Sequence, residues 1–78
     1  MTLAQLIRHK RISLGMTLEE VADAAGTTKS HMHAIESGAV PNPGILMCAR
    51  IALVLGLNVQ QMAAAAIAQA MIKQESER

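Results

Sequence analysis

The sequence has no phenylalanine, tyrosine or tryptophan, and this absence limits the kinds of core that the chain can build. Strands favour aromatic and β-branched side chains, whereas Leu, Met and Ala favour helices. Hydrophobic residues still make up 51% of the 78 residues, so a core is available. The composition predicts one domain, 1–78, of helices packed on helices, with no room for a separate catalytic domain.

Cysteine and charge are also scarce. The single cysteine, Cys48, cannot form an internal disulfide, and we expect it to be a small buried hydrophobic residue. No signal-peptide pattern and no apolar run of about 18 residues occur, so we expect a soluble, cytoplasmic protein without membrane contact. The net charge of only +1 gives no indication of a nucleic-acid partner.

No group of residues suggests catalysis or a bound cofactor. His31 and His33 form a His-x-His pair, but on a helix they diverge by about 200° and cannot hold one metal ion from a single face. There is no nucleophile with its base, no paired carboxylates and no phosphate-binding glycine loop. We therefore expect no enzymatic activity, cofactor, metal or small-molecule ligand.

Capping signals divide the chain into five predicted helices. The predicted N-caps are Thr2, Thr17, Thr28, Asn42 and Asn58, and the glycines that follow the first four helices are Gly15, Gly26, Gly38 and Gly56. Pro43 suits the first position of the fourth helix. The segment 45–55 is apolar nearly all round, which predicts that it is the central buried helix. The polar tail, 75–78, is expected to fray.

The third helix, within "GTTKSHMHAIESG", has a small apolar stripe formed by Met32 and Ile35. Its opposite face gathers small or hydrogen-bonding side chains, and no acid occurs between Asp23 and Glu36. Such a face suits a major groove, where base edges offer donors, acceptors and thymine methyl groups. The same composition is also typical of a helix face that is exposed to solvent and binds nothing. The short segment 26–28 between the second and third helices has the length of a helix-turn-helix turn.

The stretch "IRHKRISLGMTLEEVADAAGTTKSHMHAIESG", followed by "PGILMCARIALVLGLNVQQM", resembles the Cro/repressor-type helix-turn-helix family, also called xenobiotic-response-element-like. The matching residues, in order, are Arg8, Arg11, Gly15, Thr17, Glu20, Val21, Ala22, Gly26, Thr28, Ile35, Glu36, Gly38, Leu55 and Gly56. The resemblance covers residues 6 to 62. It implies a compact, all-α, five-helix lambda-repressor-like DNA-binding domain.

The resemblance also implies roles for individual residues. The positions that match base readers are Lys29, Ser30, His33 and Ala34, and those that match phosphate contacts are Thr17, Thr28 and Ser37. Arg11 and Glu36 match a structural ion pair, and an inward-facing Glu36 needs such a cation. Leu18 stands where many members have a polar residue, and the loop "AVPNPG" carries no Lys or Arg. Both departures predict that the protein makes weaker contacts with the DNA backbone and that its affinity for DNA depends more on dimerisation.

The last predicted helix, 58–74, carries more apolar surface than one small domain easily covers. Its apolar residues are Val59, Met62, Ala66, Ile67, Ala70 and Met71. The distal part could pack back on the first helix or pair with a second subunit, and we expect pairing. A dimer would place two recognition helices about 34 Å apart, one turn of DNA.

The resulting interpretation is a homodimeric transcription regulator that binds an inverted-repeat operator in double-stranded DNA. We expect a repressor, but the sequence does not choose between repression and activation. By analogy with the family, the small size suggests a regulator of phage, plasmid or restriction-control type. In the alternative interpretation the chain has the same fold but does not bind DNA. It would then be an antitoxin-like module that binds a protein partner through the last helix.

Overall fold

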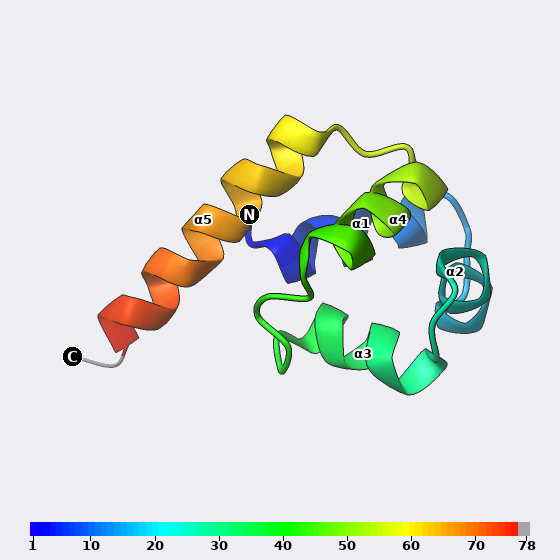
Figure 1. Cartoon of the computed structure of the whole chain (residues 1–78), viewed down its shortest axis with the longest axis horizontal. Helices are drawn as coiled ribbons and strands as arrows, with labels where there is room; N and C mark the ends of the chain where they lie inside the picture. Colours follow the sequence, from blue (N-terminus) through cyan, green and yellow to red (C-terminus); the bar gives the residue numbers. More distant parts are fainter. Residues whose placement is uncertain (77–78) are drawn as a thin grey trace.

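The computed structural model describes residues 1–76, with side chains described as far as Met71. Five helices follow one another, with no strand in this range: α1 (Leu3–Ser13), α2 (Leu18–Ala25), α3 (Lys29–Ser37), α4 (Ile45–Leu55) and α5 (Val59–Ser76). In Figure 1, α5 passes the N-terminus, and its last turns extend away from the other four helices. The all-α, helix-turn-helix architecture predicted from the sequence is confirmed.

The predicted starts of the first three helices are confirmed by hydrogen bonds. Thr2 Oγ1 accepts from Gln5 N at 3.2 Å, and Thr2 N donates to Gln5 Oε1 at 3.0 Å. Thr17 and Glu20 make the same reciprocal pair at 3.1 and 2.9 Å. Thr28 caps α3 through its hydroxyl. These bonds satisfy backbone N–H groups that the first turn of a helix leaves without partners.

The predicted start of α4 is wrong. Gly44, not Asn42, is the N-cap, and it makes no side-chain capping bond. Asn42 Oδ1 instead accepts from Gly44 N at 3.2 Å, which forms a turn that contains Pro43. Gly44 has φ 88°, a conformation that residues with a Cβ rarely adopt. The turn therefore delays the helix until Ile45.

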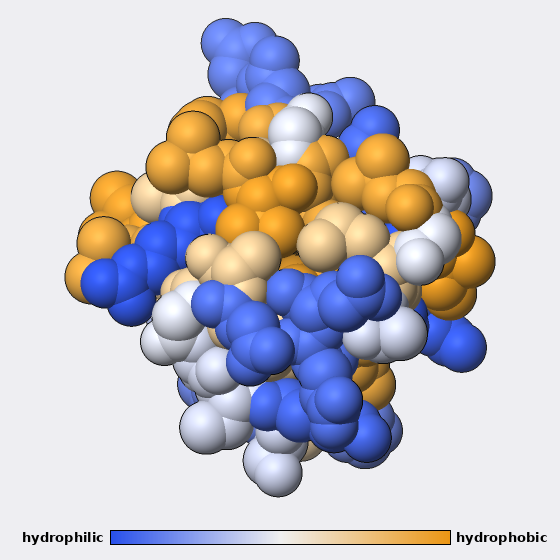
Figure 2. Space-filling model, turned by 90° about the vertical axis from the view of Figure 1, so that its right-hand side faces the viewer, coloured by the Kyte–Doolittle hydropathy of each residue, from blue (hydrophilic) through white to orange (hydrophobic). Residues whose placement is uncertain are grey.

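The prediction that α4 is the central buried helix is also wrong. Only its face with Ile51, Ala52 and Leu55 is buried, while Ile45 is 89% and Leu53 85% exposed. The reason is that α1, α2 and α5 cover one side of α4 and leave the other open. Figure 2 shows hydrophobic side chains over the upper half of the face that lies on the right in Figure 1, near the C-terminal end of α4.

The core lies between the helices and draws on all of them. Its largest fully buried side chains are Leu3, Ile7, Val21, Met32, Ile35, Ile51 and Leu55. From α5, Met62 and Ala65 complete this cluster. The small alanines of α5 allow it to lie close to α1 and α4, so the last helix is part of the domain.

The structure shows that α5 packs back on α1 within one subunit. Gln69 Oε1 accepts from Ala4 N at 3.0 Å, and Gln69 Nε2 donates to Pro41 O at 2.8 Å. One side chain thus joins α5 to α1 and to the loop after α3. Helix α5 includes residues 75–76 of the tail that was predicted to fray, whereas 77–78 lie outside the described residues.

Candidate nucleic-acid interface

The turn between α2 and α3 sets the position of the candidate recognition helix. Gly26 has φ 72°, Gly26 N donates to Asp23 O at 3.2 Å, and Thr27 N donates to Ala22 O at 2.9 Å. This is the pattern of a Schellman motif, which ends one helix and redirects the chain. Thr28 then caps α3 directly, so a hydrogen-bonded connection of three residues joins the two helices.

Three of the four predicted base readers lie together on the outer face of α3. Lys29, Ser30 and His33 are exposed, and with Leu18 of α2 they line one open hollow of about 460 Å³. Ala34 is half-buried and does not line this hollow. The hollow therefore combines one cation, hydrogen-bonding groups and one aliphatic side chain.

The predicted phosphate contacts differ in the hydrogen bonds they already make. The hydroxyls of Thr17 and Thr28 accept from backbone N–H groups of their own helices, so each hydroxyl proton is free to be donated. Ser37 Oγ already donates to Ala34 O at 3.1 Å. Ser37 must rotate away from that carbonyl before it can donate to a phosphate, which Thr17 and Thr28 need not do.

An acidic neighbour of the hollow was missed from the sequence. Glu19 Oε1 of α2 lies 3.9 Å from Lys29 Nζ, and both side chains are mostly exposed. Glu19 belongs to the first turn of α2, so the acid-free stretch between Asp23 and Glu36 gave no indication of it. The helix-turn-helix spacing was the available signal, because it brings the N-terminal turns of the two helices together.

The expected partners Arg11 and Glu36 are in contact beneath this surface. Arg11 Nε lies 2.7 Å from Glu36 Oε2, and Arg11 Nη2 donates to Glu36 Oε1 at 3.1 Å. Arg11 Nη1 also donates to Met16 O at 2.8 Å. These bonds tie α1 to α3 and to the chain that enters α2.

Comparison with known proteins identifies the family of the chain. A family model described as helix-turn-helix matches residues 7–62, which is more than half of the chain. The chain belongs to the Cro/C1-type helix-turn-helix family. It is 41% identical over 51 residues to a protein of Methanothermobacter thermautotrophicus (strain Delta H), and the match covers 65% of this chain and 72% of that protein. That relative is named an uncharacterized HTH-type transcriptional regulator. No solved structure matches the chain.

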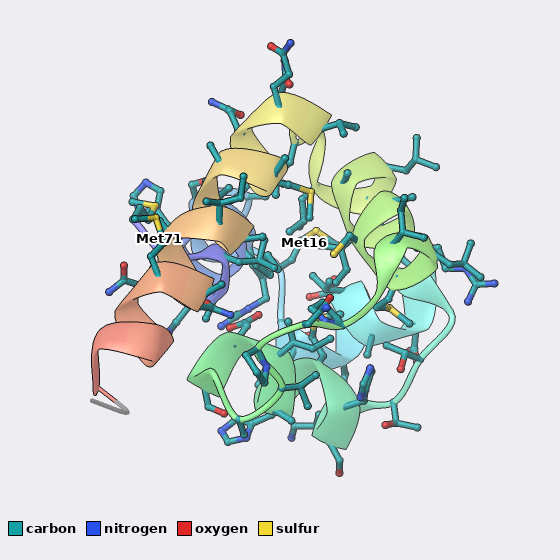
Figure 3. The ribbon with its side chains drawn as sticks, turned by 60° about the vertical axis from the view of Figure 1, so that its left-hand side comes forward. Met16 and Met71 are labelled. Carbon is teal, nitrogen blue, oxygen red and sulfur yellow. The ribbon has the colours of Figure 1, made fainter. Side chains whose placement is uncertain are left out.

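The α5 surface of this helix-turn-helix protein is partly apolar. Val59 is 72%, Ile67 62% and Met71 57% exposed, Ala70 is exposed and Ala66 is half-buried. Figure 3 shows Met71 on the side of α5 that lies away from α3 and α4. Met62 was predicted to lie on the dimer surface, but it does not lie on the exposed face of α5. It is only 5% exposed because it packs into the core of its own subunit.

Cys48 lies in an apolar groove of about 300 Å³ between α4 and α5 and is half-buried, not fully buried as expected. Burial raises the pKa of the Cys48 thiol, because the thiolate loses hydration.

Among the described residues, no three His, Cys, Asp or Glu side chains are placed to hold a metal ion. No helix in this part of the chain is long and apolar enough to cross a membrane.

Proposed function

We propose that this helix-turn-helix protein is a DNA-binding transcription regulator that inserts α3 into the major groove. The observation that carries the proposal is the hollow in which Lys29, Ser30 and His33 lie exposed together. Their amine, hydroxyl and imidazole groups match the donors and acceptors of base edges. Family membership and the relative's name support the same function.

Phosphate contacts are proposed at the starts of α2 and α3. The start of α3 combines a partial positive charge with the free hydroxyl proton of Thr28. At the start of α2 the hydroxyl proton of Thr17 is also free, but the carboxylates of Glu19 and Glu20 offset the partial positive charge of that helix. These groups flank the hollow without adding net charge, which reconciles DNA binding with a net charge of only +1. Ser37 is a weaker candidate because its hydroxyl proton is already donated.

We further propose that the protein acts as a homodimer on an inverted-repeat operator. Val59, Ile67 and Met71 leave apolar area on α5 that a second copy would remove from water. A twofold axis would place two α3 helices about 34 Å apart, in successive major grooves. Operator occupancy would then exclude RNA polymerase from an overlapping promoter, which is repression.

The test is selection from a random-sequence DNA pool at two salt concentrations, followed by sequencing of the bound fraction. We expect an inverted repeat with half-sites about one helical turn apart. The double variant Lys29→Ala, His33→Ala should fold normally and lose binding to that site. The matched control is His9→Ala with Lys10→Ala on α1, which removes the same two residue types outside the hollow and should retain binding.

Failure to enrich any motif at low salt would refute the DNA-binding proposal. The antitoxin-like alternative, a module that binds a protein partner through α5, would then be favoured. Enrichment of a single half-site would instead support DNA binding and refute the dimeric operator.

A further inference from the structure

Leu18 occupies an unusual place for an aliphatic residue, at the surface where α2 meets α3. One side of its side chain packs against the buried core. Its other side lines the hollow with Lys29, Ser30 and His33, and also a second hollow with Thr17 and Glu19. Leu18 is therefore half-buried, with its remaining surface turned toward the proposed DNA-binding face.

The chemistry of this position restricts what Leu18 can contact. The side chain has no donor or acceptor, so pressing it against phosphate oxygens or against polar base edges would remove their hydration without replacing it. Among the groups that base pairs present in the major groove, the C5-methyl group of thymine is the apolar one. The exposed surface of Leu18 is thus complementary to one base only.

The polar neighbours of Leu18 support the same contact. Lys29, at the rim of the hollow, can approach a phosphate or a guanine edge, while Ser30 and His33 can hydrogen-bond to bases beside the methyl group. Ala34, the apolar residue on the outer face of α3, is half-buried and does not line the hollow. Leu18 is consequently the aliphatic residue of the hollow that can meet a base.

We propose that Leu18 is a specificity-determining residue that packs against the 5-methyl group of one thymine in each half-site. The inference rests on the proposed DNA-binding function and extends base reading from α3 to the first residue of α2. Leu18 stands where many family members have a polar residue, and from the sequence this departure predicted only a weaker contact with the DNA backbone. The proposal gives Leu18 a function of its own.

The experiment uses the selected operator and the full chain. Each thymine is replaced in turn by uracil, in both half-sites together, and the dissociation constant is measured by fluorescence anisotropy. Uracil keeps the hydrogen-bonding groups and loses only the methyl group. For the wild type we expect one position to weaken binding about fourfold per half-site, the effect of losing one buried methyl group.

The variants separate base reading from packing. Leu18→Ala and Leu18→Gln should bind thymine and uracil equally at that position, while the uracil effects at other positions persist. Leu18→Met, which keeps an apolar side chain of similar size, should retain most of the discrimination. Lys29→Ala should weaken binding to every duplex without changing the thymine-to-uracil ratio at this position.

Two results would overturn the inference while leaving DNA binding intact. One is a wild-type protein that is insensitive to uracil at every position. The other is discrimination that persists in both Leu18→Ala and Leu18→Gln, which would assign the methyl contact to another residue. Failure to select any operator would refute the proposed function itself and this inference with it.

Discussion

Arg11 and Glu36 are 25 residues apart in the chain, yet their side chains form a two-pronged ion pair with contacts of 2.7 and 3.1 Å. Their side chains are only 13% and 5% exposed. A third bond, from Arg11 to Met16 O, holds the chain that leads into α2. The pair therefore positions α3 from below without contacting its outer face.

Replacing Glu36 by Ala should strongly destabilise the domain. The change leaves the Arg11 guanidinium poorly hydrated and without its carboxylate, and breaking such a pair costs about 3 kcal/mol or more in the free energy of unfolding. Urea denaturation followed by circular dichroism measures this cost. Glu19→Ala, which removes an exposed carboxylate, is the control and should cost less than about 1 kcal/mol. Similar losses in the two variants would contradict the structural role of the pair.

Gln69→Ala should also lower stability, because the variant leaves Ala4 N and Pro41 O without their bonds to this side chain. Part-buried backbone groups that lose their partners cost about 1 to 3 kcal/mol each, and access of water should keep the total near 2 kcal/mol. Gln61→Ala, on the exposed side of the same helix, should change stability by less than about 0.5 kcal/mol. Equal urea midpoints for Gln69→Ala and the wild type would show that this bridge contributes nothing.

Glu19→Gln should strengthen operator binding. Its carboxylate lies 3.9 Å from Lys29 Nζ and repels DNA phosphates, so its removal should raise affinity about threefold to tenfold at low salt. The gain should shrink as salt increases, because exposed charges are screened. Anisotropy titrations at several salt concentrations provide the measurement. Asp23→Asn removes an exposed acid near the other end of α2 and should have a smaller effect; an equal gain there would indicate a general charge effect.

Cys48 should react slowly with iodoacetamide near neutral pH, since burial raises the thiol pKa and lowers the thiolate fraction. The same reaction in concentrated urea should be faster. The folded state holds the thiol proton more tightly than the unfolded chain does. This contribution to stability is therefore present below the ordinary thiol pKa and is lost as pH rises through the raised value.

Urea titrations at increasing alkaline pH test this linkage against Cys48→Ala. The wild type should lose more stability than the variant over this range. Equal losses, together with equal alkylation rates in the folded and unfolded proteins, would contradict the burial effect.

Ile67→Asp should convert the proposed dimer to a folded monomer. Ile67 is 62% exposed in one subunit, so a charge there costs little unless a second copy covers it. Sedimentation equilibrium reports the oligomeric state. Ile12→Asp, at an exposed isoleucine on α1, is the matched control and should leave the dimer intact. A wild type that remains monomeric at high concentration would refute dimerisation.

The helix starts at Thr2, Thr17 and Thr28 were predictable because their capping bonds join residues only three apart. Such bonds depend on local backbone geometry, and local residues encode them. The start of α4 was not predictable in this way. Asn42 suits either an N-cap or a turn, and both conformations use the same side-chain oxygen.

The extent of burial was harder to read from the pattern. Segment 45–55 is apolar on most sides, so periodicity could not say which side the other helices would cover. The candidate site shows the same limit. The periodicity of α3 placed Ser30 and His33 on one face, with Lys29 at the N-terminal end of the helix, but it could not predict the approach of Leu18 and Glu19 from α2.

The amino-acid sequence alone was enough to specify five helices, the short turn between α2 and α3, and the polar face of α3, because each depends on residues within a few positions of one another. The contacts of Gln69 with residues 65 and 28 positions away, the open side of α4 and the hollow around Leu18 required the folded chain. These features depend on how helices pack in three dimensions, and many packings are compatible with the same local pattern of apolar and polar residues.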